Sequence, residues 1–127
     1  TDLDFRVMIR RHNESGALAT IGLFAREEQI ELGVIETDEQ DRVTGYIEKP
    51  TYQYRASMGA YVFGRNVLPF VPAHTRFDLP DLVRALIAAR EHVAGYEHKG
   101  YWLDIGRPED YARAQSDFER MRDRLLN

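Results

Sequence analysis

The sequence predicts an α/β fold with a mixed, mainly parallel sheet and flanking helices. Stretches with apolar side chains at helical spacing alternate with short apolar stretches that are typical of buried strands. Strands joined by a short turn pair antiparallel, whereas strands separated by a helix favour parallel pairing, so this order predicts a mixed sheet. The 127 residues, 43% hydrophobic and 30% charged, suit one globular domain or part of a larger one.

A helix is expected near the N-terminus, where one face at helical spacing carries Phe5, Met8, Ile9 and His12. Asp2 or Asp4 would cap its start, and Gly16 would end it. Residues 17–24 (ALATIGLF) are apolar on both alternating faces, which predicts a strand covered on both sides of a sheet. The charged residues 25–31 that follow indicate a loop.

The middle of the chain predicts three strands. Residues 33–50 have the pattern of two short strands around a polar turn at 38–41, and Pro50 closes the second strand. Residues 58–64 form another apolar stretch, opened and closed by glycine, and residues 66–71 predict one helical turn.

The C-terminal third predicts two more helices and two strands. Asp78 would cap a helix over residues 77–91, with Pro80 in its first turn and an apolar stripe of Leu82, Val83, Leu86 and Ile87. Strands are expected at 93–98 and 101–104. A last helix would begin at Pro108 and bury a seam of Tyr111, Ala114, Phe118, Met121 and Leu125.

Composition excludes several classes of function. With 17 basic and 21 acidic side chains, the net charge of −4 provides no general attraction to nucleic acid or to an anionic membrane. The absence of cysteine excludes disulfides, a thiolate nucleophile and a zinc–thiolate site, and fits a cytoplasmic location. No apolar run approaches the roughly 20 residues that span a bilayer.

Chemistry-bearing residues gather at three places, and the first is Glu48-Lys49-Pro50. The proline restrains Lys49 to an extended conformation, so the two charged side chains are expected to leave the strand end in opposite directions. Such a pair can offer an ammonium to a phosphate and a carboxylate to a sugar hydroxyl. The alternative is an exposed charged pair without a ligand.

The second place is SMGAYVF at residues 57–63. Gly59 would allow a ligand to approach the backbone closely, and Ser57 supplies a small hydroxyl. The alternative is that Gly59 marks a β-bulge.

The third place is YWLDIGRPEDY at residues 101–111. Strand alternation would place Trp102 and Asp104 on one face, and a half-buried carboxylate there would need a partner. Asp104 suits Mg²⁺, which takes one or two carboxylates and otherwise keeps phosphate oxygens and water. The alternative is that Asp104 caps the last helix or pairs with Arg107.

Taken in order, these segments resemble the sugar-1-phosphate nucleotidyltransferases, the NDP-sugar pyrophosphorylase family. The segments that carry the resemblance are TDLDF (1–5), LGVIETDEQDRVTGYIEKP (32–50), SMGAYVF (57–63), FDLPDLV (77–83) and GYWLDIGRPEDY (100–111). The resemblance implies the Rossmann-like fold of nucleotide-diphospho-sugar transferases. It favours the functional interpretation over the alternative at all three places.

The resemblance also implies roles for single residues. Gly33 would contact the sugar, Glu48 would hold sugar hydroxyls, and Lys49 would act in catalysis by neutralising the sugar phosphate. Ser57 and Gly59 would line the sugar pocket.

Asp104 matches the family's second metal-binding aspartate, so the resemblance implies Mg²⁺ as its partner and as the cofactor. The implied partners are a nucleoside triphosphate and a sugar 1-phosphate, which would give an NDP-sugar and pyrophosphate. Neither a nucleic acid nor a membrane is expected as a partner.

The family's glycine-rich nucleotide loop is not found in the sequence. We therefore expect residues 1–127 to be the C-terminal, sugar-phosphate-binding part of a catalytic domain whose nucleotide-binding half is missing, and to be inactive alone. An alternative is a non-catalytic sugar-phosphate-binding or regulatory module that has kept the fold. The sheet edge left by missing strands would invite pairing between chains into a homo-oligomer. Ser57 and Leu32 depart from the residues of many members, which leaves the sugar and the base open.

Overall fold

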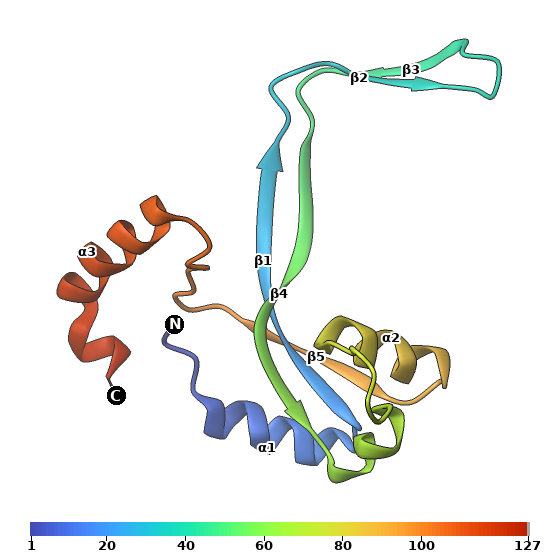
Figure 1. Ribbon diagram of the computed structural model, residues 1–127. Coiled ribbons are helices and arrows are strands. Elements are labelled where there is room, and N and C mark those ends of the chain that lie inside the picture. Colours follow the sequence, from blue (N-terminus) through green and yellow to red (C-terminus); the bar gives the residue numbers. More distant parts are fainter. Residues whose placement is uncertain (127) are drawn as a thin grey trace. The chain divides into compact units, whose positions relative to one another are not determined.

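The computed structural model describes residues 1–126 (Figure 1). The helices are α1 (Phe5–Ser15), η1 (Arg65–Phe70, a 3₁₀ helix), α2 (Leu79–Ala88) and α3 (Pro108–Leu125), and the strands are β1 (Ala19–Gln29), β2 (Val34–Thr37), β3 (Val43–Ile47), β4 (Thr51–Phe63) and β5 (Val93–His98). The chain forms two compact units. Unit 1 contains Thr1–Phe24 and the described chain from Ser57 onward, and unit 2 is Ala25–Ala56.

The sheet of unit 1 is mixed, as the sequence predicts. Its strand order is β4-β1-β5, and β1 pairs in parallel with β5 from Ala19 opposite Val93 to Phe24 opposite His98. The end of β4 lies beside the start of β1, where the Gly64 N–H donates to the Leu18 carbonyl oxygen at 2.9 Å, so these two strands run in opposite directions (Figure 1). The fold is therefore α/β, with helices flanking a mixed sheet.

Two hydrophobic clusters stabilise unit 1, one around Ala19 and the other formed by Leu3, Met8 and Met58. Ala19 packs with the side chains of η1 and α2, including Leu86, which is fully buried. The next residue of β1, Thr20, points the other way and hydrogen-bonds to His12 of α1 at 2.9 Å. Successive side chains of a strand point to opposite faces, so β1 is covered on both sides, as its apolar sequence predicts.

The helix ends follow the predicted capping residues. Asp4 caps α1 by accepting a hydrogen bond from the Arg6 N–H at 2.8 Å, and Gly16 ends the helix with a φ of 65°. Asp78 begins α2 through a reciprocal capping box with Asp81. The expected buried face of α1 is only partly correct, because Met8 and His12 are buried whereas Phe5 and Ile9 are exposed.

Unit 2 contains the predicted hairpin of β2 and β3, which pair antiparallel with Val34 opposite Ile47. The Asp38 carboxylate accepts hydrogen bonds from the backbone N–H groups of Gln40 and Arg42, which stabilises the polar turn. The loop predicted at residues 25–31 is wrong, since β1 continues to Gln29. Its charged side chains are exposed, and cross-strand bonds such as that between Glu27 and Gln53 hold this part extended.

The strand predicted at residues 101–104 is also wrong, because this segment has no regular secondary structure. The backbone N–H and C=O of Tyr101 are hydrogen-bonded to the N-terminal segment instead. The Tyr101 N–H donates to the Asp2 carboxylate at 2.7 Å, and the Tyr101 carbonyl accepts from the Asp2 N–H at 3.2 Å. A long-range pairing with residue 2 thus replaces the sheet ladder that the local apolar pattern predicts.

The buried seam predicted for α3 is not observed. Tyr111 and Phe118 are exposed, and the buried residue of α3 in the described chain is Asp117. Asp117 accepts a hydrogen bond from the Tyr101 hydroxyl at 2.8 Å and is paired with Arg120. Polar contacts therefore attach α3 to residue 101. Within residues 1–126, no helix is both long enough and apolar enough to cross a bilayer.

Candidate functional site

The first group of candidate residues lies where the β2–β3 hairpin of unit 2 opens. Gly33 directly precedes β2, and Glu48 directly follows β3. Because Val34 pairs with Ile47, the register places Gly33 and Glu48 next to each other across the hairpin. The structure therefore brings together two residues that are 15 positions apart and that the resemblance assigns to the sugar.

Tyr46 is a residue of this group that the sequence did not suggest. Its hydroxyl donates to Glu48 Oε2 at 2.6 Å, and its ring lies over Gly33. A Cβ added at Gly33 would come within 2.6 Å of Tyr46 Cζ, so a larger residue there fits only if the tyrosine side chain moves. The hydrogen bond to the Glu48 carboxylate, together with burial, raises the pKa of Tyr46.

The expected backbone of Lys49 is wrong, because its φ is 43°, in the left-handed region, and not extended. This conformation is unusual for a residue that is neither glycine nor asparagine, and it costs about 1–3 kcal/mol. The chain bends at Glu48 and Lys49 between the end of β3 and the start of β4, and the Ile30 N–H donates to the Pro50 carbonyl at 3.0 Å. The pairing of β3 with β2 before Pro50 and the hydrogen bond from Ile30 to Pro50 therefore override the preference for an extended Lys49 that the proline imposes.

The Lys49 ammonium lies 3.8 Å from Glu31 Oε2, and both side chains are more than half exposed. An exposed pair of this kind contributes only about 0–1 kcal/mol. The positive charge is therefore accessible to an anionic ligand.

The second group lies in unit 1, on and beside β4. Ser57 Oγ is hydrogen-bonded to the Tyr61 hydroxyl at 3.0 Å and accepts from the Gly59 N–H at 3.3 Å. Gly59 has a φ of 73°, which favours glycine, and a Cβ added there would meet no atom within 4 Å. The space over Gly59 is thus open to a ligand.

Trp102 links this segment to the one that carries Asp104. Its indole N–H donates to the Met58 carbonyl at 3.2 Å, between Ser57 and Gly59, and its ring lies 5.3 Å from that of Phe24. The structure therefore joins two of the three places where the sequence gathers chemistry-bearing residues. Asp104 lies two residues beyond this anchor.

Asp104 itself is exposed, so the expectation that it is half-buried is wrong. It does not cap α3, whose N-cap is Arg107. Within the described chain, Asp104 forms no hydrogen bond or ion pair with another residue. Its carboxylate is therefore available to a cation or another ligand.

The turn that carries Trp102 is attached to the N-terminus by Asp2. Besides the Tyr101 N–H, the Asp2 carboxylate contacts His98 Nε2 at 2.8 Å and Arg124 Nε at 2.5 Å, with 10% of the Asp2 side chain exposed. Burial alone would raise the pKa of Asp2, but the hydrogen bonds from Arg124, Tyr101 and His98 outweigh it and hold that pKa below its ordinary value. The sequence suggested Asp2 only as a helix cap, because these partners lie about 100 residues away.

The structure thus describes the candidate residues as two groups: Gly33, Glu48 and Lys49 in unit 2, and Ser57, Gly59 and Asp104 in unit 1. Within each group, side chains distant in sequence lie together.

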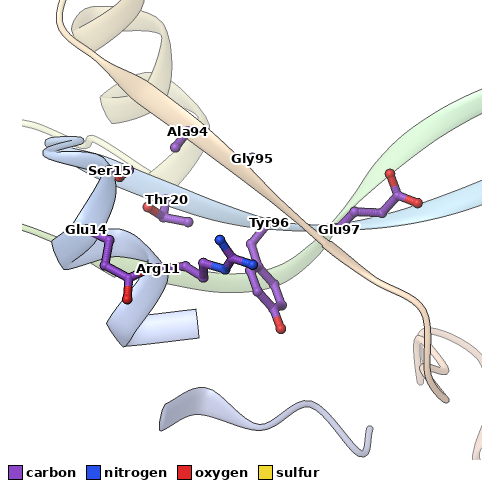
Figure 2. Close-up of a pocket in the computed structure, with 8 residues that line it drawn as sticks. All are labelled: Arg11, Glu14, Ser15, Thr20, Ala94, Gly95, Tyr96 and Glu97. Carbon is purple, nitrogen blue, oxygen red and sulfur yellow. The ribbon is translucent and has the colours of Figure 1, made fainter. Parts of the chain in front are cut away.

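A pocket of about 470 Å³ lies elsewhere in unit 1, between α1 and β5, and is lined by none of the predicted site residues. Figure 2 shows Arg11 and Glu14 of α1 on one side and residues 94–97 of β5 on the other. It combines one basic and two acidic side chains with part of β5, and none of the predicted chemistry falls there.

Comparisons with known proteins agree with the motifs. A family model described as nucleotidyl transferase matches residues 1–121. The chain is 33% identical over 123 residues to a mannose-1-phosphate guanylyltransferase of Mycobacterium tuberculosis, covering 92% of this chain and 34% of that enzyme. It is 32% identical over 126 residues to a glucose-1-phosphate adenylyltransferase of Halalkalibacterium halodurans, covering 91% of this chain and 33% of that enzyme.

A UTP–glucose-1-phosphate uridylyltransferase of Synechocystis is 29% identical over 120 residues, covering 89% of this chain and 31% of that enzyme. The chain thus spans about a third of the length of these relatives. Among solved structures, HddC from Yersinia pseudotuberculosis has a similar fold, with a TM-score of 0.58 and 22% identity over 91% of this chain and 50% of that one. Since the family match covers nearly the whole sequence, this chain belongs to the nucleotidyl transferase family, as its resemblance to the sugar-1-phosphate nucleotidyltransferases predicts.

Proposed function

We propose that the protein carrying this chain joins a sugar 1-phosphate to a nucleoside triphosphate, giving an NDP-sugar and pyrophosphate. The single observation that supports the proposal is the bond from Trp102 to Met58, because it holds Trp102, two residues before Asp104, on the backbone between Ser57 and Gly59. The relatives named above support the same reaction type. These relatives include a guanylyltransferase, an adenylyltransferase and a uridylyltransferase, so the base is left open.

In the proposed reaction, an oxygen of the sugar phosphate attacks the α-phosphorus of the triphosphate. The bond from that phosphorus to the bridging oxygen breaks, and pyrophosphate leaves. The Lys49 ammonium would neutralise the sugar phosphate, and the Glu48 carboxylate would accept hydrogen bonds from sugar hydroxyls. Catalysis would then depend on in-line positioning and charge neutralisation, without a covalent intermediate.

A divalent cation fits Asp104, whose exposed carboxylate has no partner among the described residues. Mg²⁺ takes one or two carboxylates and completes its shell with water and phosphate oxygens, so one aspartate from this chain is a sufficient contribution. When bound, the ion would neutralise charge on the reacting phosphates. No group of three or more potential metal-binding side chains occurs among residues 1–126.

We further propose that this chain is the C-terminal, sugar-phosphate-binding part of the catalytic domain, that it acts in the cytoplasm, and that it turns over no substrate alone. Its sheet ends at β4 and β5, and an open strand edge favours pairing into a homo-oligomer. Light scattering of the purified protein measures that assembly.

The test of function is pyrophosphate release by the intact natural protein, measured with a panel of nucleoside triphosphates and sugar 1-phosphates. Asp104→Asn should abolish Mg²⁺-dependent turnover and leave the circular dichroism spectrum and melting temperature unchanged, because the side chain is exposed and unpaired. The matched control is Asp110→Asn, a semi-exposed acid in the first turn of α3. If Mg²⁺-dependent turnover persists in Asp104→Asn, the assignment of Asp104 as a metal ligand is wrong.

A non-catalytic sugar-phosphate-binding module is the second candidate. The exposed Lys49 and Glu48 at the hairpin end favour it for a protein that lacks the nucleotide-binding half. It would bind sugar 1-phosphate but release no pyrophosphate with any triphosphate. The same panel separates the two candidates.

A further inference from the structure

Tyr46 lies against both Gly33 and Glu48, the two residues of unit 2 that the family resemblance assigns to the sugar. Its ring lies directly on the backbone of Gly33, and its hydroxyl donates to the Glu48 carboxylate at 2.6 Å. In this position the ring covers Gly33 on the side where a Cβ would project, and the hydroxyl takes up one hydrogen-bonding site of the Glu48 carboxylate, at Oε2. A sugar that takes both of these positions must therefore displace Tyr46.

The position of Tyr46 follows from the register of the hairpin. Tyr46 and Glu48 are two residues apart at the end of β3, so their side chains leave the same face. Tyr46 pairs with Ile35, and Gly33 lies two residues before it on the neighbouring segment. This diagonal relation brings the long aromatic side chain over the glycine.

The phenol is chemically similar to the ligand that it would exclude. A phenolic O–H that donates to a carboxylate makes the same type of hydrogen bond as a sugar hydroxyl. The flat ring on a glycine backbone makes the same type of contact as the apolar face of a pyranose. Tyr46 is 63% exposed, so little packing opposes its rotation into solvent.

We propose that Tyr46 occupies the sugar position between Gly33 and Glu48 in the ligand-free protein and is displaced when a sugar 1-phosphate binds. This inference rests on the proposed function. Tyr46 is then a specificity-determining residue. A sugar is admitted when it has a hydroxyl that replaces the phenolic O–H on Glu48, and it loses that bond when it has none.

The test is the dissociation constant of glucose 1-phosphate and of mannose 1-phosphate, measured by calorimetry on the intact protein. Tyr46→Phe removes the competing hydroxyl but keeps the ring, and Tyr46→Ala removes both. We expect Tyr46→Phe to lower the dissociation constant about fivefold, which is the effect of one net hydrogen bond, and Tyr46→Ala to lower it at least as much. Tyr52→Phe is the matched control, an exposed tyrosine of the same unit, and should change nothing.

A second readout follows the side chain directly. In protein with ¹³Cζ-labelled tyrosine, the Tyr46 signal is assigned by its loss in Tyr46→Phe. Saturation with the sugar phosphate should shift it toward the value of a tyrosine without a carboxylate partner. An unmoved signal at saturation would overturn the inference.

The outcomes separate the inference from the proposed function. If the wild-type protein binds a sugar 1-phosphate and both Tyr46 variants bind equally or more weakly, the inference is overturned and the function stands. If neither the wild-type protein nor any variant binds a sugar phosphate or releases pyrophosphate, both are overturned. Tighter binding by the Tyr46 variants supports both.

Discussion

Replacing Asp2 with alanine removes a buried carboxylate that joins three segments far apart in the sequence. Asp2 holds the N-terminal segment to Tyr101 and His98 after β5 and to Arg124 of α3. These contacts span 96 to 122 residues, so they close most of the chain into unit 1. The variant therefore tests whether this carboxylate organises the turn that carries Trp102.

The expected loss can be worked out from the contacts. Hydrogen bonds to a charged group contribute about 1.5–3 kcal/mol each when buried. The bonds from the Tyr101 N–H at 2.7 Å and from His98 at 2.8 Å are of this kind, whereas Arg124 is 57% exposed and adds little. Asp2→Ala should therefore lower the free energy of unfolding by about 3–5 kcal/mol, as for other broken buried pairs.

The assay is urea unfolding followed by the fluorescence of Trp102, the single tryptophan of the chain, which lies next to Tyr101. For a domain of this size the expected loss corresponds to a melting temperature lower by about 10 °C or more. Asp104→Ala is the control, because this exposed aspartate should change stability by less than about 0.5 kcal/mol. A loss below about 1 kcal/mol in Asp2→Ala would contradict the view that its carboxylate joins these segments.

The remaining predictions concern packing and acid stability. A Cβ at Gly100 would overlap the Asp2 carboxylate, so Gly100→Ala should lower the free energy of unfolding by about 1–3 kcal/mol. Gly106→Ala should not, because the nearest atom to a Cβ there, Asp104 Oδ2, is 3.6 Å away. Equal melting curves of the two variants would contradict this. Leu86 is fully buried and Ile87 is 60% exposed, so Leu86→Ala should lower stability by about 2–5 kcal/mol and Ile87→Ala by much less, and the reverse order in urea would be inconsistent with the observed face of α2. Because the pKa of Asp2 is lowered from 3.8, its stabilising effect is present above that pH and is lost as the pH falls through the lower folded-state value. Acid titration of stability should therefore be shallower in Asp2→Asn than in the wild type, and parallel acid limbs would refute the assignment.

Much of the local structure could be predicted from the sequence. The caps Asp4 and Asp78 and the turn at Asp38 each depend on a side chain that bonds to backbone within four residues. The neighbouring positions of Gly33 and Glu48 follow from the same hairpin. For these elements, the atoms that decide the structure lie within one short stretch of chain.

The errors share a different property. Residues 25–29 form a strand although they are charged, and Lys49 adopts a left-handed conformation before a proline. The position of the Tyr46 ring over Gly33 likewise depends on the register of the β2–β3 hairpin as well as on residue type. In each case a partner strand supplies the deciding contacts, and the local preference is worth too little to oppose them.

The sequence by itself determined the family, the α/β class and the identity of the candidate residues, because these are properties of residue types in a fixed order. Only the tertiary structure decided that Tyr101 hydrogen-bonds to Asp2 and that residues 101–104 form no strand. It likewise decided that Trp102 bonds to Met58 and that Asp104 is exposed. The physical reason is distance along the chain. A buried carboxylate about 100 residues away satisfies the backbone of Tyr101, and no pattern within a short window contains that partner.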